Sequence, residues 1–168
     1  PPTQTLRNAT TAFTFLAGCD ASRPIRRTVS SESTGDESSY IPAQEFAQSA
    51  SPGHYGRSSF VRCEPKTGRW HQIRRHLNGL SMPILGDTQH GNSHTNREWR
   101  NYGLLDPGRL ALHCAKISLP PSPVSPAMEV TCSLPDELRN LVEALPWIEE
   151  AKELAPELVE PSKVTMFE

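Results

Sequence analysis

The segment Pro65–Asp87 constrains the fold more than any other part of this chain, because two glycine turns enclose a short and highly basic helical pattern. It reads PKTGRWHQIRRHLNGLSMPILGD, with five cationic or imidazole side chains between the two turns. Ile73, Leu77 and Leu80 follow at spacings of four and three, which places them on one helical face. Gly79 supplies a stop signal. The segment therefore predicts a turn and a short helix held by one apolar stripe, with arginines facing outward.

Strand-like segments lie on both sides of this helix. Each is rich in β-branched or aromatic residues, which favour a pleated and half-buried backbone. The expected strands cover residues 10–17, 55–64, 109–119 and 128–134. Strands, a helix, further strands and a closing helix indicate an α+β fold with a mainly antiparallel mixed sheet and flanking helices.

Two further helices complete the predicted pattern. The polar segment NSHTNREWRNYG, residues 92–103, predicts a short helix that packs through Trp99 and Tyr102. The closing helix covers residues 136–145 and gathers its leucines and valine on one side. Ser133 and Asp136 have the spacing of a capping box, which would start this closing helix.

Composition divides the chain into parts. Only 36% of the residues are hydrophobic, the mean hydropathy is −0.51, and the 16 prolines cluster together with many serines. Residues 20–53 are polar and poor in bulky apolar groups, which favours a Ser/Pro-rich mobile insertion that could hold a short helix over 43–50. Packed structure is expected in residues 1–19 and 54–145, and an acidic tail in residues 146–168.

Charge is distributed unevenly along the chain, although the net charge is only −2. Residues 54–116 contain ten lysines or arginines against four acids, whereas residues 117–168 contain three against ten. A basic middle followed by an acidic end is typical of a nucleic-acid face backed by a solvated outer helix. Chance clustering on an ordinary surface is the alternative.

The four cysteines are widely separated and form no C-x-x-C pair, and the sequence shows neither a signal peptide nor an apolar run of membrane-spanning length. This pattern favours a reduced, intracellular protein. Cys63 and Cys114 lie in apolar-rich segments and are expected as small core residues.

A metal site is worth considering because His90 and His94 lie four residues apart and His113 precedes Cys114. Without a third and fourth ligand at a recognisable interval, these pairs do not make a zinc pattern, so no metal is expected. The chain also lacks the G-x-x-x-x-G-K pattern of a phosphate-binding loop.

The segment 65–87 resembles the C-terminal motif of the RluA-type RNA pseudouridine synthases, P-x-T-G-R-x-H-Q-I-R-x-H-L followed by P-I-L-G-D. With Trp70 at its variable position, it is most similar to the tRNA pseudouridine synthase C branch. The resemblance covers about residues 9–145. It implies a pseudouridine synthase-like fold and the isomerisation of uridine to pseudouridine in RNA, with tRNA as the expected substrate and no cofactor or metal. We further expect a monomer with no membrane association. The cytoplasm is the expected location, and the nucleus and an organelle are the alternatives.

The resemblance also implies roles for residues of the motif. In the family an Asp is the nucleophile, and an arginine of this motif is its ion-pair partner. A carboxylate in a water-free pocket needs such a fixed cation to stay ionised. By position this arginine is Arg74, with a plain surface arginine as the alternative. The residues expected to contact RNA are Lys66, Arg69, Trp70, His71, Arg75 and His76.

Two of these residues have structural alternatives. Trp70 could stack on a base or pack against the sheet. His71 could contact RNA or be a buried, satisfied structural histidine.

The nucleophile itself has no counterpart in the sequence. The family's catalytic element, Arg-Leu-Asp followed by Thr-Ser-Gly, is expected upstream of Thr67, and no segment there matches it. Asp20 lacks the preceding Arg-Leu, and Asp87 and Asp106 belong to turns. We therefore expect a C-terminal portion, with residues 1–19 as the truncated start of the catalytic domain, that is inactive alone. A catalytically dead RNA-binding remnant and a truncated gene model are the alternatives.

Overall fold

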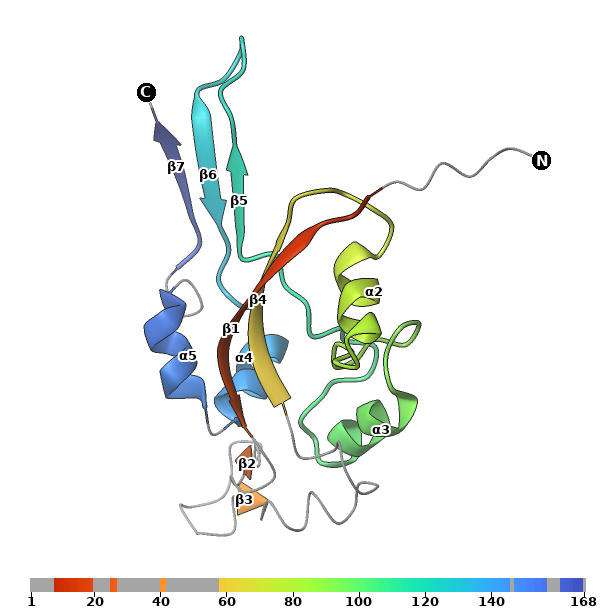
Figure 1. Cartoon of the computed structure of the whole chain (residues 1–168). Helices are drawn as coiled ribbons and strands as arrows, with labels where there is room; N and C mark the ends of the chain where they lie inside the picture. Colours follow the sequence, from red (N-terminus) through yellow and green to blue (C-terminus); the bar gives the residue numbers. More distant parts are fainter. Residues whose placement is uncertain are drawn as a thin grey trace, which may run out of the picture.

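The computed structural model describes residues 8–19, 25–26, 40–41, 58–145, 147–156 and 161–167. Within them the structure is α+β, with four helices and small antiparallel sheets (Figure 1). The predicted α+β class and the antiparallel pairing are confirmed, and the pseudouridine synthase-like fold stays a prediction. The strands do not join into one sheet among the described residues, however, because they pair in separate groups.

The longest strands form a hairpin-like pair at the centre of the structure. Strand β1 (Thr11–Cys19) pairs antiparallel with β4 (Ser58–Pro65), and the register shifts between Phe15 and Ala17. β-branched and aromatic residues make both segments good strands. The shift brings two consecutive residues of β1, Leu16 and Ala17, into the core.

The expected insertion separates these two strands. Of residues 20–53, the structure describes only β2 (Ile25–Arg26) and β3 (Tyr40–Ile41), which pair antiparallel. The helix considered over 43–50 lies outside the described residues.

A separate three-stranded sheet contains β5 (Lys116–Leu119), β6 (Ala127–Thr131) and β7 (Lys163–Phe167), in that order. Figure 1 shows it extending away from the helices. Its register aligns apolar residues in two rows across the three strands, which are Ile117, Val130 and Val164, and Leu119, Met128 and Met166. The four members of these rows on β5 and β7 are exposed.

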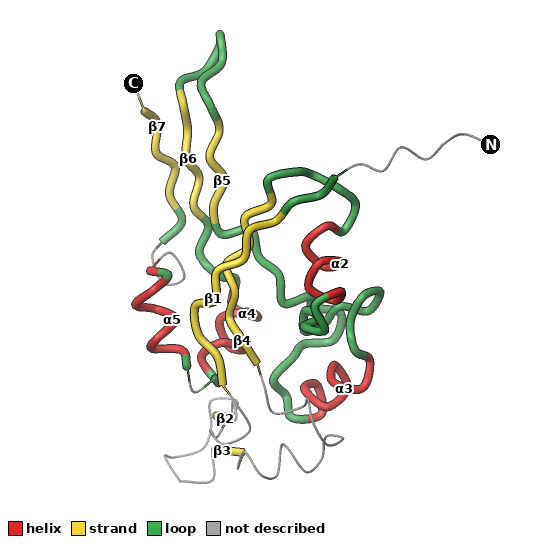
Figure 2. Tube along the Cα trace, viewed as in Figure 1, coloured by secondary structure: helices red, strands yellow, loops and turns green. Residues whose placement is uncertain are grey.

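Four helices flank the central strand pair. They are α2 (Gln72–Gly79), α3 (Ser93–Asn101), α4 (Asp136–Glu143) and α5 (Ile148–Leu154). Figure 1 shows α2 and α3 on one side of β1 and β4, with α5 on the other. Figure 2 shows that loops connect α2 to α3 and α3 to β5. Helix α5 and the strand β7 both lie in residues 146–168, the segment expected as an acidic tail.

The core lies between β1 and the helices. Trp99 and Trp147 are buried, and the Trp147 ring stacks on Phe60 with ring centroids 5.6 Å apart. The leucines of the closing helix reach the same cluster. Burial of Trp99 confirms the predicted packing residue of α3. Burying such large aromatic and aliphatic side chains is the main favourable term in folding.

Four local predictions are wrong. Of the strand expected over residues 109–119, only Lys116–Leu119 is a strand. Leu80 is 56% exposed, because α2 ends at Gly79 and Leu80 lies beyond the helix. Cys114 is exposed rather than in the core, because it lies outside the strands next to a solvated sheet. No capping box starts α4: its N-cap has no side-chain hydrogen bond, and the Ser133 hydroxyl pairs with that of Ser162 at 3.2 Å.

Candidate functional site

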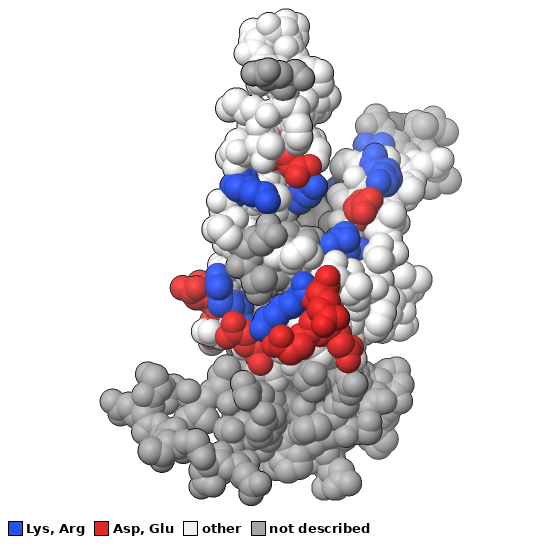
Figure 3. Space-filling view, turned by 90° about the vertical axis from the view of Figure 1, so that its left-hand side faces the viewer, with Lys and Arg blue, Asp and Glu red and all other residues white. Residues whose placement is uncertain are grey.

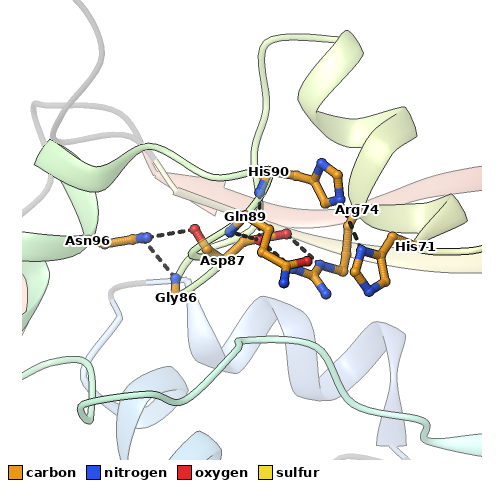
Figure 4. Close-up of polar contacts among 7 residues, drawn as sticks. All are labelled: His71, Arg74, Gly86, Asp87, Gln89, His90 and Asn96. Atoms are coloured by element: carbon orange, nitrogen blue, oxygen red, sulfur yellow. Dashed lines mark hydrogen bonds and ion pairs between the residues drawn. The ribbon is translucent and has the colours of Figure 1, made fainter.

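A buried ion pair joins the two halves of the basic motif. The Arg74 side chain leaves α2 and donates from Nε to Oδ2 and from Nη2 to Oδ1 of Asp87, both at 2.7 Å (Figure 4). The Asp87 side chain is 0% exposed and that of Arg74 is 17% exposed. Two parallel bonds between a guanidinium and a carboxylate fix the guanidinium plane. Arg74 is therefore held in one orientation.

The turn that carries Asp87 is closed by further hydrogen bonds. Asp87 Oδ1 accepts the backbone N–H groups of Gln89 at 2.9 Å and His90 at 2.8 Å. The Asn96 side chain of α3 donates to the Asp87 carbonyl oxygen at 2.9 Å and accepts the Gly86 N–H at 2.8 Å. The turn is thus also fixed by α3, through the buried side chain of Asn96.

These contacts decide the protonation state of the carboxylate. The hydrogen bonds from Arg74, opposed by burial and helped by the backbone N–H groups, hold the pKa of Asp87 well below its usual range. The same hydrogen bond raises the pKa of Arg74. Both groups are therefore charged at neutral pH.

Two glycines allow the turn to approach its neighbours this closely. Gly86 has a φ of 79°, and a Cβ there would lie 1.8 Å from the carbonyl oxygen of Arg109. A Cβ at Gly91 would lie 2.0 Å from the carbonyl oxygen of Asp87. Neither position has room for any other residue.

A second network anchors α2 to the start of β1. Gln72 is buried; its Oε1 accepts the Thr67 hydroxyl at 2.8 Å, and its Nε2 donates to the Thr10 carbonyl oxygen at 2.9 Å and the Thr11 hydroxyl at 3.0 Å. His76 Nδ1 lies 3.0 Å from the same Thr11 hydroxyl. Gln72 therefore positions the helix that carries Arg74. The sequence analysis did not single out Gln72. Its position inside the basic motif, close to the arginines, was the signal that could have identified it.

The start of α2 carries an aromatic stack. His71 has a left-handed φ of 52°, and its ring stacks on Trp70 with ring centroids 4.3 Å apart. His71 Nδ1 lies 3.0 Å from Nε2 of His90. Burial, Arg74 and His90 lower the pKa of His71. Trp70 is 78% exposed, so it does not pack against the sheet.

The remaining predicted contact residues lie around the same helix. Arg69 and Arg75 are exposed, whereas His76 is half-buried. Lys66 is exposed and pairs with Glu64 at 2.9 Å. Figure 3 looks onto the side of the molecule that carries α5, where acidic and basic side chains lie intermixed. That side is therefore not a uniformly basic surface.

The other acids and histidines fall outside this arrangement. Asp20 is not among the described residues, and Asp106 is exposed. His113 Nε2 lies 3.0 Å from the Cys132 carbonyl oxygen. Across the described ranges, no group of three or more metal-ligating side chains comes together. In that same part of the chain, no helix has the length and apolarity to cross a membrane.

Known proteins share part of this sequence. The tRNA pseudouridine synthase C of Vibrio parahaemolyticus is 35% identical over 94 residues, 56% of this chain and 37% of that protein. The protein of the same name from Pasteurella multocida is 48% identical over 61 residues, 36% of this chain and 24% of its own length. That of Vibrio cholerae is 32% identical over 93 residues, 55% of this chain and 37% of its length.

The matched part of this chain thus spans little more than a third of these relatives at most. No protein-family model matches the chain, and no solved structure matches it significantly. The motif with its buried ion pair and these sequence matches lead to one conclusion: the chain is partially homologous to tRNA pseudouridine synthase C, of the RluA family.

Proposed function

We propose that this chain is the C-terminal portion of an RluA-like RNA pseudouridine synthase with a pseudouridine synthase-like fold. Such an enzyme breaks the bond between ribose C1′ and uracil N1, turns the base and forms a new bond from C1′ to C5, releasing the C5 hydrogen to water. We propose tRNA as its substrate, because the relatives are named for tRNA. We expect it to work inside the cell as a monomer.

The fixed guanidinium of Arg74 is the observation that carries this proposal. Two of its nitrogens, Nε and Nη2, are held by Asp87, and no hydrogen bond of Nη1 is found among the described residues. The side chain keeps 17% of its surface exposed. A cation that is rigid and still partly accessible suits a second, incoming carboxylate, whose ionised form it would stabilise.

Asp87 is not that second carboxylate. Its side chain is 0% exposed. Its oxygens already accept two bonds from Arg74 and two from the backbone. A nucleophile needs an accessible lone pair. We therefore assign Asp87 a positioning role and expect the nucleophilic Asp to come from a segment that precedes the motif in a complete enzyme.

RNA would bind around the start of α2. We propose that Arg69 and Arg75 contact phosphates, since both are exposed. We propose Lys66, His71 and His76 as weaker contributors, because each already has a partner within the protein. Lysine and arginine contacts to phosphates make binding fall steeply as salt rises.

A non-catalytic RNA-binding protein is the second candidate. It is favoured by the ion pair between Asp87 and Arg74. Because of this pair, the charge of the motif arginine is already neutralised without a nucleophilic carboxylate. This candidate predicts salt-dependent RNA binding and no product.

Release of tritium from tRNA labelled at uridine C5 tests the proposal, because only isomerisation moves that hydrogen to water. The 168-residue chain and the longest in-frame product of its gene are assayed side by side. We expect release by the longer product and none by the chain alone. Salt-sensitive tRNA binding without release by either protein would favour the second candidate, and absence of both would refute the proposal.

A further inference from the structure

The chain has three tryptophans, and one of them is in an unusual environment. Trp99 and Trp147 are 1% and 2% exposed, whereas Trp70 is 78% exposed. A large aromatic ring gains most when water is excluded from it, so a tryptophan that is 78% exposed contributes little to folding. Its position at the start of the most basic helix requires another explanation.

The Trp70 ring is held in place although it is exposed. It stacks on His71 at an interplanar angle of 23°, and His71 contacts His90 in turn. The His90 backbone N–H is bonded to the buried Asp87 carboxylate. Only one of the two Trp70 faces is therefore covered, and the covering ring is tied to the rigid turn.

The sequence on both sides of this open ring is cationic. Arg69 precedes Trp70, and Arg75 lies five residues after Trp70, in the first turn of α2; both are exposed. The first turn of α2 contains no acidic residue. An anionic ligand that approached the ring would meet positive charge and no opposing carboxylate within this segment.

We propose that Trp70 and His71 form a stacking platform for an unpaired nucleobase of bound RNA, while Arg69 and Arg75 hold the phosphates on either side of it. This inference rests on the proposed function and specifies the RNA feature that is recognised. Many proteins bind single-stranded nucleic acids by stacking unpaired bases on aromatic rings that lie among cationic side chains. A base within a duplex has both faces covered by its neighbours and cannot use the platform.

The platform predicts a preference for single-stranded RNA that depends on one side chain. The probe is a hairpin RNA with an unpaired loop, compared with a blunt duplex of equal length. We expect Trp70→Ala to weaken loop binding by roughly 5- to 150-fold, the loss typical of one stacked base. Trp70→Phe keeps a ring and should bind within a few-fold of wild type. The control is Leu80→Ala, an exposed apolar residue just beyond the other end of α2, which should change nothing.

Fluorescence gives an independent readout on the unmodified protein. Because the other two tryptophans are buried, acrylamide quenches mainly Trp70. Saturating loop RNA should protect this emission, and the duplex should not. Unchanged quenching with loop RNA bound, or loop binding unaffected by Trp70→Ala, would overturn the platform. If the platform is overturned but Arg69→Ala still weakens RNA binding, the proposed function survives without the platform. If the wild-type chain binds neither the hairpin nor the duplex, both the platform and the proposed function are refuted.

Discussion

Replacement of Asp87 by alanine tests the buried ion pair. The side chain is 0% exposed and receives two hydrogen bonds from Arg74 and two from the backbone N–H groups of Gln89 and His90. Alanine leaves all four donors without their acceptor. Removing one partner of a buried pair typically costs about 3–5 kcal/mol. We expect a loss of this size in the free energy of unfolding.

Asp87→Asn tests the contribution of the carboxylate charge separately from that of the side-chain volume. The amide has nearly the volume of the carboxylate and keeps one oxygen for the backbone N–H groups, but loses the charge that Arg74 requires. Hydrogen bonds to charged groups contribute about 1.5–3 kcal/mol, so we expect a loss in that range. Asp106→Ala is the matched control, because Asp106 is an exposed acid in a turn. Its effect should stay within about 0.5 kcal/mol.

Urea unfolding followed through the two buried tryptophans measures all three variants. Trp99 and Trp147 report loss of the core, and circular dichroism provides a second probe for the two-state test. The reasoning is refuted if Asp87→Ala unfolds at the same urea concentration as Asp106→Ala. That result would mean that the pair does not form in solution and that Arg74 is not held.

Three further predictions concern the same turn and the cysteines. Because the pKa of Asp87 is lowered in the folded protein, its stabilisation is complete above its unfolded value of about 4 and lost as the pH falls below it. The stability difference between wild type and Asp87→Asn should therefore be constant from pH 7 to 5 and shrink below about pH 4, by urea unfolding. Gly86→Ala should prevent or strongly destabilise folding, whereas Gly68→Ala, where a Cβ meets nothing within 4 Å, should be tolerated. Mass-resolved alkylation should label Cys114 before Cys63, because burial raises the pKa of the Cys63 thiol.

A specific result would contradict each of these three predictions. A stability difference between wild type and Asp87→Asn that grows in acid would reverse the sign of the linkage. Equal melting temperatures for the two glycine variants would show that the turn can open to admit a side chain. Faster alkylation of Cys63 would mean that β4 is not packed as described.

Local patterns predicted the elements of the site well. The turn, the helix α2 and the buried Trp99 follow from glycine positions and apolar periodicity, which act within a few residues. Leu80 fits the same periodicity but lies beyond the helix end, and spacing alone does not show where a helix stops. The spacing of Ser133 and Asp136 predicted a cap, but the Ser133 hydroxyl meets Ser162 instead.

Contacts between distant residues were not predictable in this way. Gln72 donates hydrogen bonds to Thr11 and Thr10, which lie 61 and 62 positions earlier in the sequence. These bonds exist only once β1 and α2 have packed together. Asp87 was interpreted as a turn residue, and it is one. Its pairing with Arg74 depends on how the chain returns after α2, which no local signal encodes.

The partner role of Arg74 is the central claim, and tritium release by the longest in-frame gene product tests it most directly. We predict that Arg74→Ala reduces release from C5-labelled tRNA at least about 100-fold while tRNA binding changes only a few-fold. Arg97→Ala, which removes an exposed arginine of α3, should retain full release and serves as the control. Undiminished release by Arg74→Ala would contradict the account, because the nucleophile would then need no cation from this motif.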